Sequence, residues 1–388
     1  MLLALALFSL SFDDQCIAPL KTAPVLGGKT IKFVQVLTRH GARTPLVPYL
    51  PVVNRGYWLC DSEDAIAPRM HAAPVEHFRR FKQVIDQRLV EYLPNCRSGD
   101  LILTGMEQHR KLGQFYHEYL YNTHKLLSEL PPNPKNLYVR CSDVERTFRS
   151  AQSFLHGLFP PQSPDEIIEI NTDTSDGSLL RVNKDWCKDM KNIWVNHTAS
   201  AVYNQWVDEN WIKIQDLASY FGLVKSGDNL NSICDFVTTN YCSDKRVPTI
   251  ITPDIQQVCL NVTGSYIYDY YAIDPIVTAS YTMRELMRIP KQIALGNSSV
   301  KFSLMSSHDT TVAAVLSFLG ERRVRIPPYA SHLTSELWED DASKQLYIRF
   351  VFNGEEVRLR EFNGESVALF SEFLDKYNRM NDVCKDIK

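Results

Sequence analysis

Two short segments that lie far apart in the chain each place a histidine among charged and hydroxyl side chains, directly after an apolar run. They read Arg39-His40-Gly41-Ala42-Arg43-Thr44-Pro45 and Ser306-Ser307-His308-Asp309-Thr310-Thr311. Histidine and aspartate carry out covalent and acid–base catalysis, and arginine forks match the oxygens of a phosphate. Since clustered cations repel one another unless an anion joins them, these residue types predict a site for phosphoryl transfer.

Each segment follows a stretch that is typical of a buried strand, over residues 32–38 and 300–305. A third short strand is predicted over residues 137–140, and it ends in Arg140. In open α/β sheets, ligands bind beyond the carboxyl ends of the strands. We therefore expect the two histidine segments and Arg140 to meet at one edge of a sheet.

Two sequence patterns predict capped helices behind these strands. The T-x-x-E and S-x-x-E spacings run from Thr104 to Glu107 and from Ser142 to Glu145. Apolar stripes follow, with Leu112, Tyr116, Tyr119 and Leu120 in the first helix and Val144, Phe148, Ala151, Leu155 and Leu158 in the second. The second helix would also point its N–H groups and the positive end of its dipole at an anion beside Arg140.

The segment of residues 161–274 differs in character from the rest of the chain. It carries Trp186, Trp194, Trp206 and Trp211, and it lacks the alternation of strands. We interpret it as a mostly helical cap that is inserted into an α/β core formed by residues 28–160 and 275–388. The tryptophans form either an aromatic wall for a substrate or the cap's own core, and the pattern leaves both open.

Other elements follow from periodicity and turn residues. They are an amphipathic helix over residues 75–93, a helix around 283–287, a strand over 344–352, an Asn353-Gly354 hairpin turn, a strand over 355–360 and a closing helix through 367–377.

Composition limits the function classes. The chain has 388 residues, of which 44% are hydrophobic and 22% charged, and its net charge is -3. This balance argues against a nucleic-acid-binding surface, which needs an excess of Lys and Arg. Residues 1–11 fit a short secretory signal, with a buried N-terminal strand of a cytosolic chain as the alternative. No stretch approaches the ~20 apolar residues of a membrane span, so we expect no membrane anchor.

Cysteine usage agrees with export. The nine cysteines include no C-x-x-C pair, which favours disulfides over zinc. Their pairing cannot be deduced, but an odd count leaves at least one thiol free, and we expect Cys141 to be free because its motif would bury it beside the site. N-glycosylation sequons at Asn196, Asn261 and Asn297 fit a secreted or endo-lysosomal protein.

The chain resembles the histidine acid phosphatase family, in the branch that holds prostatic and lysosomal acid phosphatases, phytases and 2-phosphoxylose phosphatase. The resemblance covers nearly the whole chain and also runs through Leu103-Thr104, Gln108-His109, Leu112-Gly113, Val139-Arg140-Cys141-Ser142-Asp143, Arg146-Thr147, Gly157-Leu158-Phe159-Pro160 and Pro327-Pro328-Tyr329-Ala330-Ser331. It implies a phosphoglycerate-mutase-like α/β fold, with a mixed sheet flanked by helices and an inserted helical cap. The chain departs from the compact acid phosphatases between Pro45 and Asp100, where it is longer.

The resemblance also implies a role for each site residue. His40 would be the nucleophile that forms a phosphohistidine, and Asp309 would protonate the leaving alcohol. The side chains that would hold the phosphoryl oxygens are Arg39, Arg43, Arg140 and His308. No metal or cofactor is implied, because the arginines supply the positive charge. The implied enzyme is a phosphoric monoester hydrolase of the acid phosphatase type, acting on a small phosphomonoester or a phosphorylated macromolecule.

Several alternatives stay open on the sequence. Arg146 either supports the site or makes a surface salt bridge, and Glu336 either braces the site or is solvated at the edge of the core. The substrate could be a 2-phosphoxylose-type glycan or an inositol phosphate, and a homodimer is not excluded. Rival functions are a mutase of the same fold, a metal-dependent hydrolase with His40, His308 and Asp309 as ligands, and a secreted phosphate-binding protein without turnover.

Overall fold

The computed structural model describes residues 12–47, 58, 60, 96–130, 132–162, 167–174, 178–244, 250–321 and 326–385. The predicted signal over residues 1–11 and the predicted helix over 75–93 lie outside them. No helix in the described part of the chain has both the length and the apolar character needed to cross a membrane.

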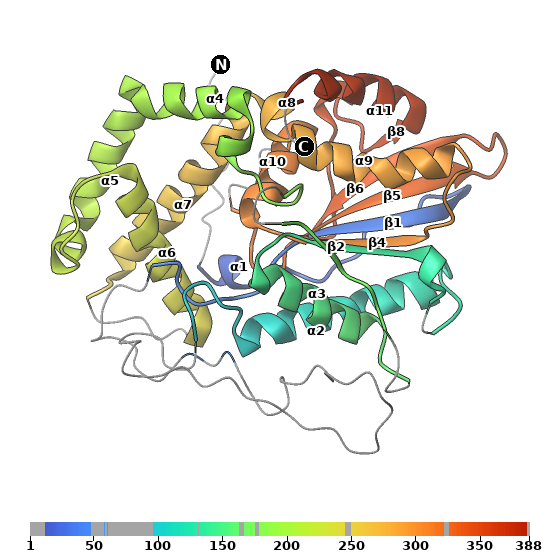
Figure 1. Ribbon diagram of the computed structural model, residues 1–388, viewed down its shortest axis with the longest axis horizontal. Helices are drawn as coiled ribbons and strands as arrows, with labels where there is room; N and C mark the ends of the chain where they lie inside the picture. Colours follow the sequence, from blue (N-terminus) through green and yellow to red (C-terminus); the bar gives the residue numbers. More distant parts are fainter. Residues whose placement is uncertain are drawn as a thin grey trace.

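A mixed sheet forms the centre of the molecule (Figure 1). Its strands are β1 (Lys29–Arg39), β2 (Leu137–Cys141), β3 (Asn171–Thr172), β4 (Phe302–Ser307), β5 (His332–Asp340), β6 (Leu346–Phe352), β7 (Glu355–Glu356) and β8 (Val367–Leu369). They run in the order β3-β2-β4-β1-β5-β6-β7, and β8 also pairs with β6. The pairs among β1, β2, β3 and β4 are parallel, whereas β5 is antiparallel to both β1 and β6.

The parallel strands end at the same edge of the sheet. Arg39 at the end of β1 is in register with Ser307 at the end of β4, and Cys141 at the end of β2 is in register with Ser306. The loops after these strands therefore leave the sheet side by side, which confirms the predicted meeting of three strand ends. Because β5 is antiparallel, its first residue, His332, lies opposite Thr38 at this edge too.

Helices cover both faces of the sheet (Figure 1). On one face lie α2 (Leu103–His117) and α3 (Glu145–Leu158), and on the other α9 (Ser280–Ala294), α10 (Asp309–Leu319) and α11 (Phe370–Tyr377). Alternate residues of β1 pack against the helices on the two faces of the sheet, since side chains along a strand point to opposite faces. Val34 and Val36 join the apolar cluster under α2 and α3, whereas Phe33 and Leu37 join the cluster under α9 and α10.

The two predicted capping boxes are wrong. The N-cap of α2 is Ile102 and that of α3 is Val144, and neither makes a side-chain capping bond. Ser142 lies outside α3, and its hydroxyl contacts Thr147 and His308 instead. The predicted apolar stripe of α2 is confirmed, because Leu112 and Tyr116 are buried in the core. Its continuation, Tyr119 and Leu120, is also buried but lies in a π-helical segment, Glu118–Thr123.

Four long helices lie to one side of the sheet, at the left in Figure 1. They are α4 (Lys188–Ala199), α5 (Ala201–Tyr220), α6 (Gly227–Asp244) and α7 (Pro253–Ile273), followed by the short α8 (Pro275–Thr278). Helices α5, α6 and α7 share an apolar cluster that contains Trp211, with Trp206 packed against it. The short β3 falls inside the segment expected to form the cap, but it pairs with β2 of the central sheet.

Four disulfides join distant parts of the chain. They are Cys16–Cys242, Cys60–Cys96, Cys187–Cys384 and Cys234–Cys259. The first ties the short N-terminal helix α1 (Phe12–Cys16) to α6, and the last ties α6 to α7. Cys141 is free and buried, as predicted.

The C-terminal hairpin forms at the predicted turn, where Asn353 and Gly354 have φ angles of 50° and 88°. The second strand is shorter than predicted, because β7 ends at Glu356. The edge of β6 that a longer β7 would need is occupied by β8, which pairs with residues 347–349. Because β8 occupies residues 367–369, the closing helix α11 begins at Phe370 and not at the predicted residue 367.

Candidate active site

The loops after β1 and β4 bring the two predicted histidine segments together. The ring centroids of His40 and His308 lie 5.6 Å apart, and an Arg39 guanidinium nitrogen lies 2.9 Å from an Asp309 carboxylate oxygen. The guanidinium of Arg39 also lies 4.1 Å from the ring centre of Tyr329, which enters from the segment before β5. His40, His308 and Arg39 are all buried.

Close backbone packing fixes the loop that carries His40. A Cβ atom on Gly41 would lie 2.3 Å from the carbonyl oxygen of Gly105, and one on Gly105 would lie 2.2 Å from that of Ala42. Only glycine at both positions lets the loop rest on the first turn of α2. The side-chain oxygen of Gln108 accepts a hydrogen bond from the Ala42 backbone N–H, at 2.9 Å, which holds the loop there.

The protonation of His40 follows from its neighbours. Its Nδ1 lies 2.8 Å from the carbonyl oxygen of Gly41. A carbonyl oxygen only accepts, so Nδ1 carries the proton and Nε2 keeps its lone pair. Burial, reinforced by the charges of Arg146, Arg39 and Arg43, holds the pKa of His40 well below its ordinary value. A neutral ring with a free Nε2 lone pair is the form that can attack an electrophile.

Asp309 is the first residue of α10 and points to Arg39. One carboxylate oxygen pairs with Arg39, and the other accepts a hydrogen bond from the Thr310 backbone N–H at 2.8 Å. Burial alone would raise the pKa of Asp309, but the charges of Arg39 and Arg43 outweigh it and hold the pKa below its ordinary value. The carboxylate is therefore poised to take up a proton only when another negative charge joins the cluster.

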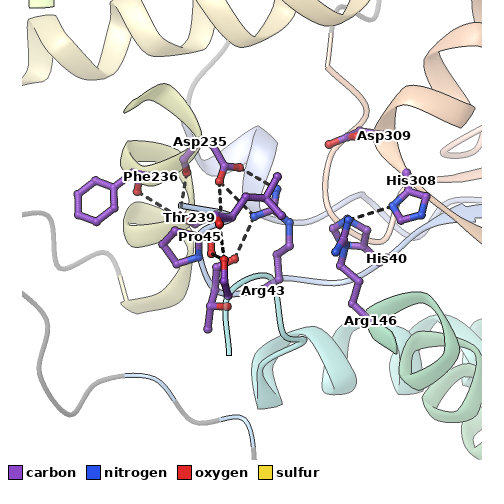
Figure 2. A network of polar contacts seen from close by, with 12 residues as sticks. His40, Arg43, Pro45, Arg146, Asp235, Phe236, Thr239, His308 and Asp309 are labelled. Atoms are coloured by element: carbon purple, nitrogen blue, oxygen red, sulfur yellow. Dashed lines mark hydrogen bonds and ion pairs between the residues drawn. The ribbon is translucent and has the colours of Figure 1, made fainter. Parts of the chain in front are cut away.

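Arg43 makes an ion pair that the sequence analysis did not predict. Its two terminal nitrogens lie 2.7 and 3.3 Å from the two carboxylate oxygens of Asp235 on α6 (Figure 2). Asp235 also accepts a hydrogen bond from the backbone N–H of Leu46. Burial opposes the charge of Arg43, but Asp235 more than compensates and raises its pKa. Thus α6 supplies a carboxylate that orients one arginine of the cluster.

Arg146 belongs to the cluster and is not a surface residue. From the first turn of α3, it places a terminal nitrogen 3.3 Å from Nδ1 of His308 (Figure 2). Nε2 of His308 lies 2.9 Å from the Ser142 hydroxyl. Since arginine only donates, Nδ1 of His308 accepts and Nε2 carries the proton. Burial, together with the nearby charge of Arg43, lowers the pKa of Arg146 to about 9. This depression shows how strongly the pocket disfavours a further uncompensated cation.

Arg140 does not join this group. Its guanidinium pairs with Asp173 and donates to the Tyr138 hydroxyl at 3.2 Å, and Glu285 lies 3.6 Å away. The phosphate-binding role expected for Arg140 from the family resemblance is therefore not reflected in its contacts. Of the two arginines in this motif, the one that faces the histidines is Arg146.

Glu336 lies in a buried network along the sheet. Its carboxylate accepts hydrogen bonds from Tyr119 at 2.5 Å, Trp338 at 2.9 Å and Arg349 at 2.8 Å. It pairs across β5 and β1 with Val34, which lies well before the strand end that carries Arg39. Glu336 thus stabilises the sheet from within, and its hydrogen bonds to Tyr119, Trp338 and Arg349 lie away from the histidine cluster.

Two further histidines, which the sequence analysis did not single out, lie buried beneath the cluster. Nε2 of His109 lies 3.1 Å from the carbonyl oxygen of Arg39, and His332 pairs with Thr38 in the sheet. Burial lowers the pKa of each to about 4. Because the unfolded chain takes up protons near pH 6.5 and the folded chain does not, these groups destabilise the fold as the pH falls from about 6.5 to 4.

We therefore expect His332→Leu to flatten the dependence of stability on pH. Each such histidine lowers the free energy of unfolding by about 1.4 kcal/mol per pH unit within that window, and the variant lacks one of them. Urea unfolding at several values between pH 7 and 4.5 measures the slope for both proteins. An unchanged slope in the variant would show that His332 is protonated in the folded protein.

Comparison with known proteins places this geometry in context. A family model described as histidine phosphatase superfamily (branch 2) matches residues 30–245 and 266–353. Counting factor 60 of Dictyostelium discoideum is 29% identical, with 89% of this chain and 85% of the relative covered. 2-Phosphoxylose phosphatase 1 of Xenopus tropicalis is 26% identical over 84% of this chain and 68% of its own length. A solved multiple inositol polyphosphate phosphatase of Bifidobacterium longum superposes with a TM-score of 0.61 at 12% identity, covering 95% of this chain and 97% of that one.

Proposed function

Because the chain belongs to branch 2 of the histidine phosphatase superfamily, we propose that this phosphatase is an acid phosphatase that hydrolyses phosphate monoesters through a phosphohistidine on His40. Asp309 is the proton donor to the leaving alcohol. Arg39, Arg43 and Arg146 hold the phosphoryl oxygens. His308 keeps Arg146 in place.

One observation carries this proposal: the buried Arg39 and Arg43 and the half-buried Arg146 converge on a neutral histidine. Arg39, Arg43 and Arg146 each have a buried Nε–H without a hydrogen-bond partner among the residues that the structure describes. Burial, and after it the nearby charge of Arg43, lowers the pKa of Arg146, so a bound anion would stabilise its charged form. A phosphate dianion would supply both the missing negative charge and acceptor oxygens for the forks.

The reaction then has two steps. In the first, Nε2 of His40 attacks phosphorus, the N–P bond forms, the P–O bond to the alcohol breaks, and Asp309 gives its proton to the departing oxygen. In the second, water attacks phosphorus, the N–P bond breaks, and Asp309 takes the proton from the water. The arginines stabilise the charge on the equatorial oxygens in both steps. The products are the alcohol and inorganic phosphate.

The pKa shifts favour acidic working conditions. Because the pKa of His40 is held well below its ordinary value, the nucleophile stays unprotonated in mild acid. Asp309, by contrast, must be protonated when the alcohol leaves, and this form is lost as the pH rises. The two requirements overlap on the acid side of neutrality.

Several features support a place in the secretory pathway. The four disulfides require an oxidising compartment to form and persist. The three sequon asparagines, Asn196, Asn261 and Asn297, are all exposed and so accessible to glycosylation. We include a secreted or endo-lysosomal location in the proposal on these grounds.

Trapping the intermediate tests the mechanism directly. The enzyme is mixed with a phosphate-labelled aryl monoester and quenched in alkali within milliseconds, because phosphohistidine survives alkali and is lost in acid. We expect label on the peptide that contains His40, and turnover that is insensitive to EDTA. Absence of label at every quench time, together with inhibition by the chelator, would instead favour a metal-dependent hydrolase.

The two neighbouring arginines provide a matched pair of variants. Arg146→Ala should lower kcat/KM by about 10²–10³-fold, since removing one donor to a developing oxyanion costs about 2–4 kcal/mol. Arg140→Ala should leave kcat/KM nearly unchanged and lower thermal stability, because it leaves the buried Asp173 without its partner. Inhibition by inorganic phosphate should weaken only in Arg146→Ala. The reverse pattern would assign phosphate binding to Arg140.

A further inference from the structure

A cavity beside the proposed phosphate site is lined largely by aromatic side chains. Its volume is about 310 Å³, and its aromatic wall consists of Trp194 on α4 and Tyr266, Tyr270 and Tyr271 on α7. Trp194 makes edge-to-face contacts with Tyr266 and Tyr270, at ring-centroid distances of 5.9 and 5.2 Å. Of the four tryptophans considered in the sequence analysis, Trp194 is the one that lines this cavity.

The cavity borders Asp309, the proposed proton donor. Thr310 lines it, and the backbone N–H of the same residue donates to Asp309. Tyr271 is close enough to Asp309 for that carboxylate to contribute to its raised pKa, although burial is the larger cause. On the other flank, Val182 lines the cavity next to Arg181, whose charge is felt at His308. An alcohol protonated by Asp309 therefore has this cavity within reach.

The polar groups around the cavity have mixed charge. Asn183, Lys184 and Asp228 line it together with the tyrosines. Lys184 pairs with Asp185 at 3.3 Å, and Asp228 accepts a hydrogen bond from the Tyr266 hydroxyl at 3.0 Å. One lysine with two nearby carboxylates gives no excess of positive charge for a second phosphate. Polar groups of both kinds equally disfavour an acyl chain, which would leave them unpaired.

On these grounds we propose that the cavity binds the alcohol part of the substrate, and that this alcohol is a neutral, hydroxylated ring such as a sugar or a cyclic polyol. The aromatic wall packs against the C–H faces of the ring, and Asn183, Lys184 and Asp228 exchange hydrogen bonds with its hydroxyl groups. The inference rests on the proposed phosphatase function and narrows its substrate class to singly phosphorylated rings. It disfavours inositol polyphosphates and phosphorylated lipids.

Three monoesters of aliphatic alcohols separate the contributions. They are myo-inositol 1-phosphate, cyclohexyl phosphate, which has the same ring without hydroxyl groups, and ethyl phosphate, which does not fill the cavity. We expect the wild-type kcat/KM to fall in that order and to be low for myo-inositol hexakisphosphate. A wild type that hydrolyses the hexakisphosphate fastest, or cyclohexyl and inositol phosphates equally well, would overturn the proposal.

Variants of the wall give the second arm. Trp194→Ala and Asp228→Asn should each lower kcat/KM for myo-inositol 1-phosphate by about ten-fold, the scale of one lost contact, and leave ethyl phosphate within about two-fold. Trp206→Ala is the matched control, since this half-buried tryptophan lies on α5 and packs in the cap cluster. Trp206→Ala should not change the ratio of the kcat/KM values for myo-inositol 1-phosphate and ethyl phosphate. An unchanged ratio in Trp194→Ala would refute the cavity as the alcohol site.

Binding distinguishes failure of the cavity from failure of the proposed function. If the wild type turns over none of the esters, the phosphatase proposal fails, and calorimetry still reports on the cavity. Wild type should then bind myo-inositol 1-phosphate more tightly than cyclohexyl phosphate. Asp228→Asn should reduce this difference, and Trp194→Ala should weaken the binding of both. Equal affinities in the wild type would refute the cavity proposal independently of turnover.

Discussion

His40→Ala is expected to lower kcat by roughly 10⁴–10⁶-fold, the scale seen when a covalent nucleophile is removed from a catalytic unit. The ring keeps Nε2 unprotonated close to the charges of Arg146, Arg39 and Arg43. Steady-state hydrolysis of an aryl phosphate, measured at a much higher concentration of the variant than of the wild type, gives the residual kcat. A variant that keeps near-native turnover would exclude the phosphohistidine mechanism.

A folded and ligand-competent variant is needed to interpret that loss. His40 is almost fully buried, so His40→Gln, which keeps more of the volume, is the second variant. Both should still bind inorganic phosphate, because Arg39, Arg43 and Arg146 remain. Retained phosphate binding with lost turnover would separate a chemical role of His40 from a structural one.

The core of the site could be predicted because its residues are adjacent in the sequence to strong strand signals. Arg39 and His40 follow β1, and His308 and Asp309 follow β4, whose six residues are all buried. In a parallel sheet, strand ends that share a register must meet, so local patterns were enough to bring these residues together. The apolar stripe of α2 could be predicted for the same reason, since helix periodicity is local.

Contacts between distant segments were not accessible from local patterns. Asp235 lies in the middle of α6, and nothing in its neighbourhood in the sequence distinguishes it from a solvated helix residue. Only the packing of α6 against the loop after β1 brings it to Arg43. The alternation of β2 also explains the contacts of Arg140, whose neighbours Val139 and Cys141 are buried while its own side chain contacts Asp173 and Tyr138.

The position of Arg146 in the sequence could have indicated its role in the site. An arginine in the first turn of a helix is electrostatically unfavourable next to the positive end of the helix dipole, unless an anion compensates. Placed directly behind a strand end, such a residue indicates anion binding more strongly than an arginine within the strand itself. The capping boxes failed for a related reason, since the Ser142 hydroxyl is engaged by His308 and is not available to cap α3.

Opposing requirements on two residues set the expected pH dependence. In the free enzyme the arginines keep the pKa of Asp309 below its ordinary value, so its carboxylate is ionised at neutral pH. A bound phosphate dianion offsets those arginines and raises this pKa, which makes the protonated acid available in the complex. Burial and the nearby arginines hold the pKa of His40 well below its ordinary value, so the nucleophile stays neutral at a lower pH than an ordinary histidine would. We therefore expect kcat to be highest at roughly pH 4–6 and to fall towards alkaline pH.

Asp309→Asn should remove that alkaline limb and separate substrates by their leaving groups. An alkyl phosphate such as ethyl phosphate needs a proton on the departing oxygen and should slow by about 10²–10⁴-fold, whereas an aryl phosphate with an acidic phenol should slow far less. Asp235→Asn is the matched control, because Asp235 pairs with Arg43 much as Asp309 pairs with Arg39. It should change both substrates by the same factor and keep the pH limb. If Asp309→Asn slows both esters equally, Asp309 is not the general acid and only positions Arg39. The proton on the leaving alcohol would then come from solvent.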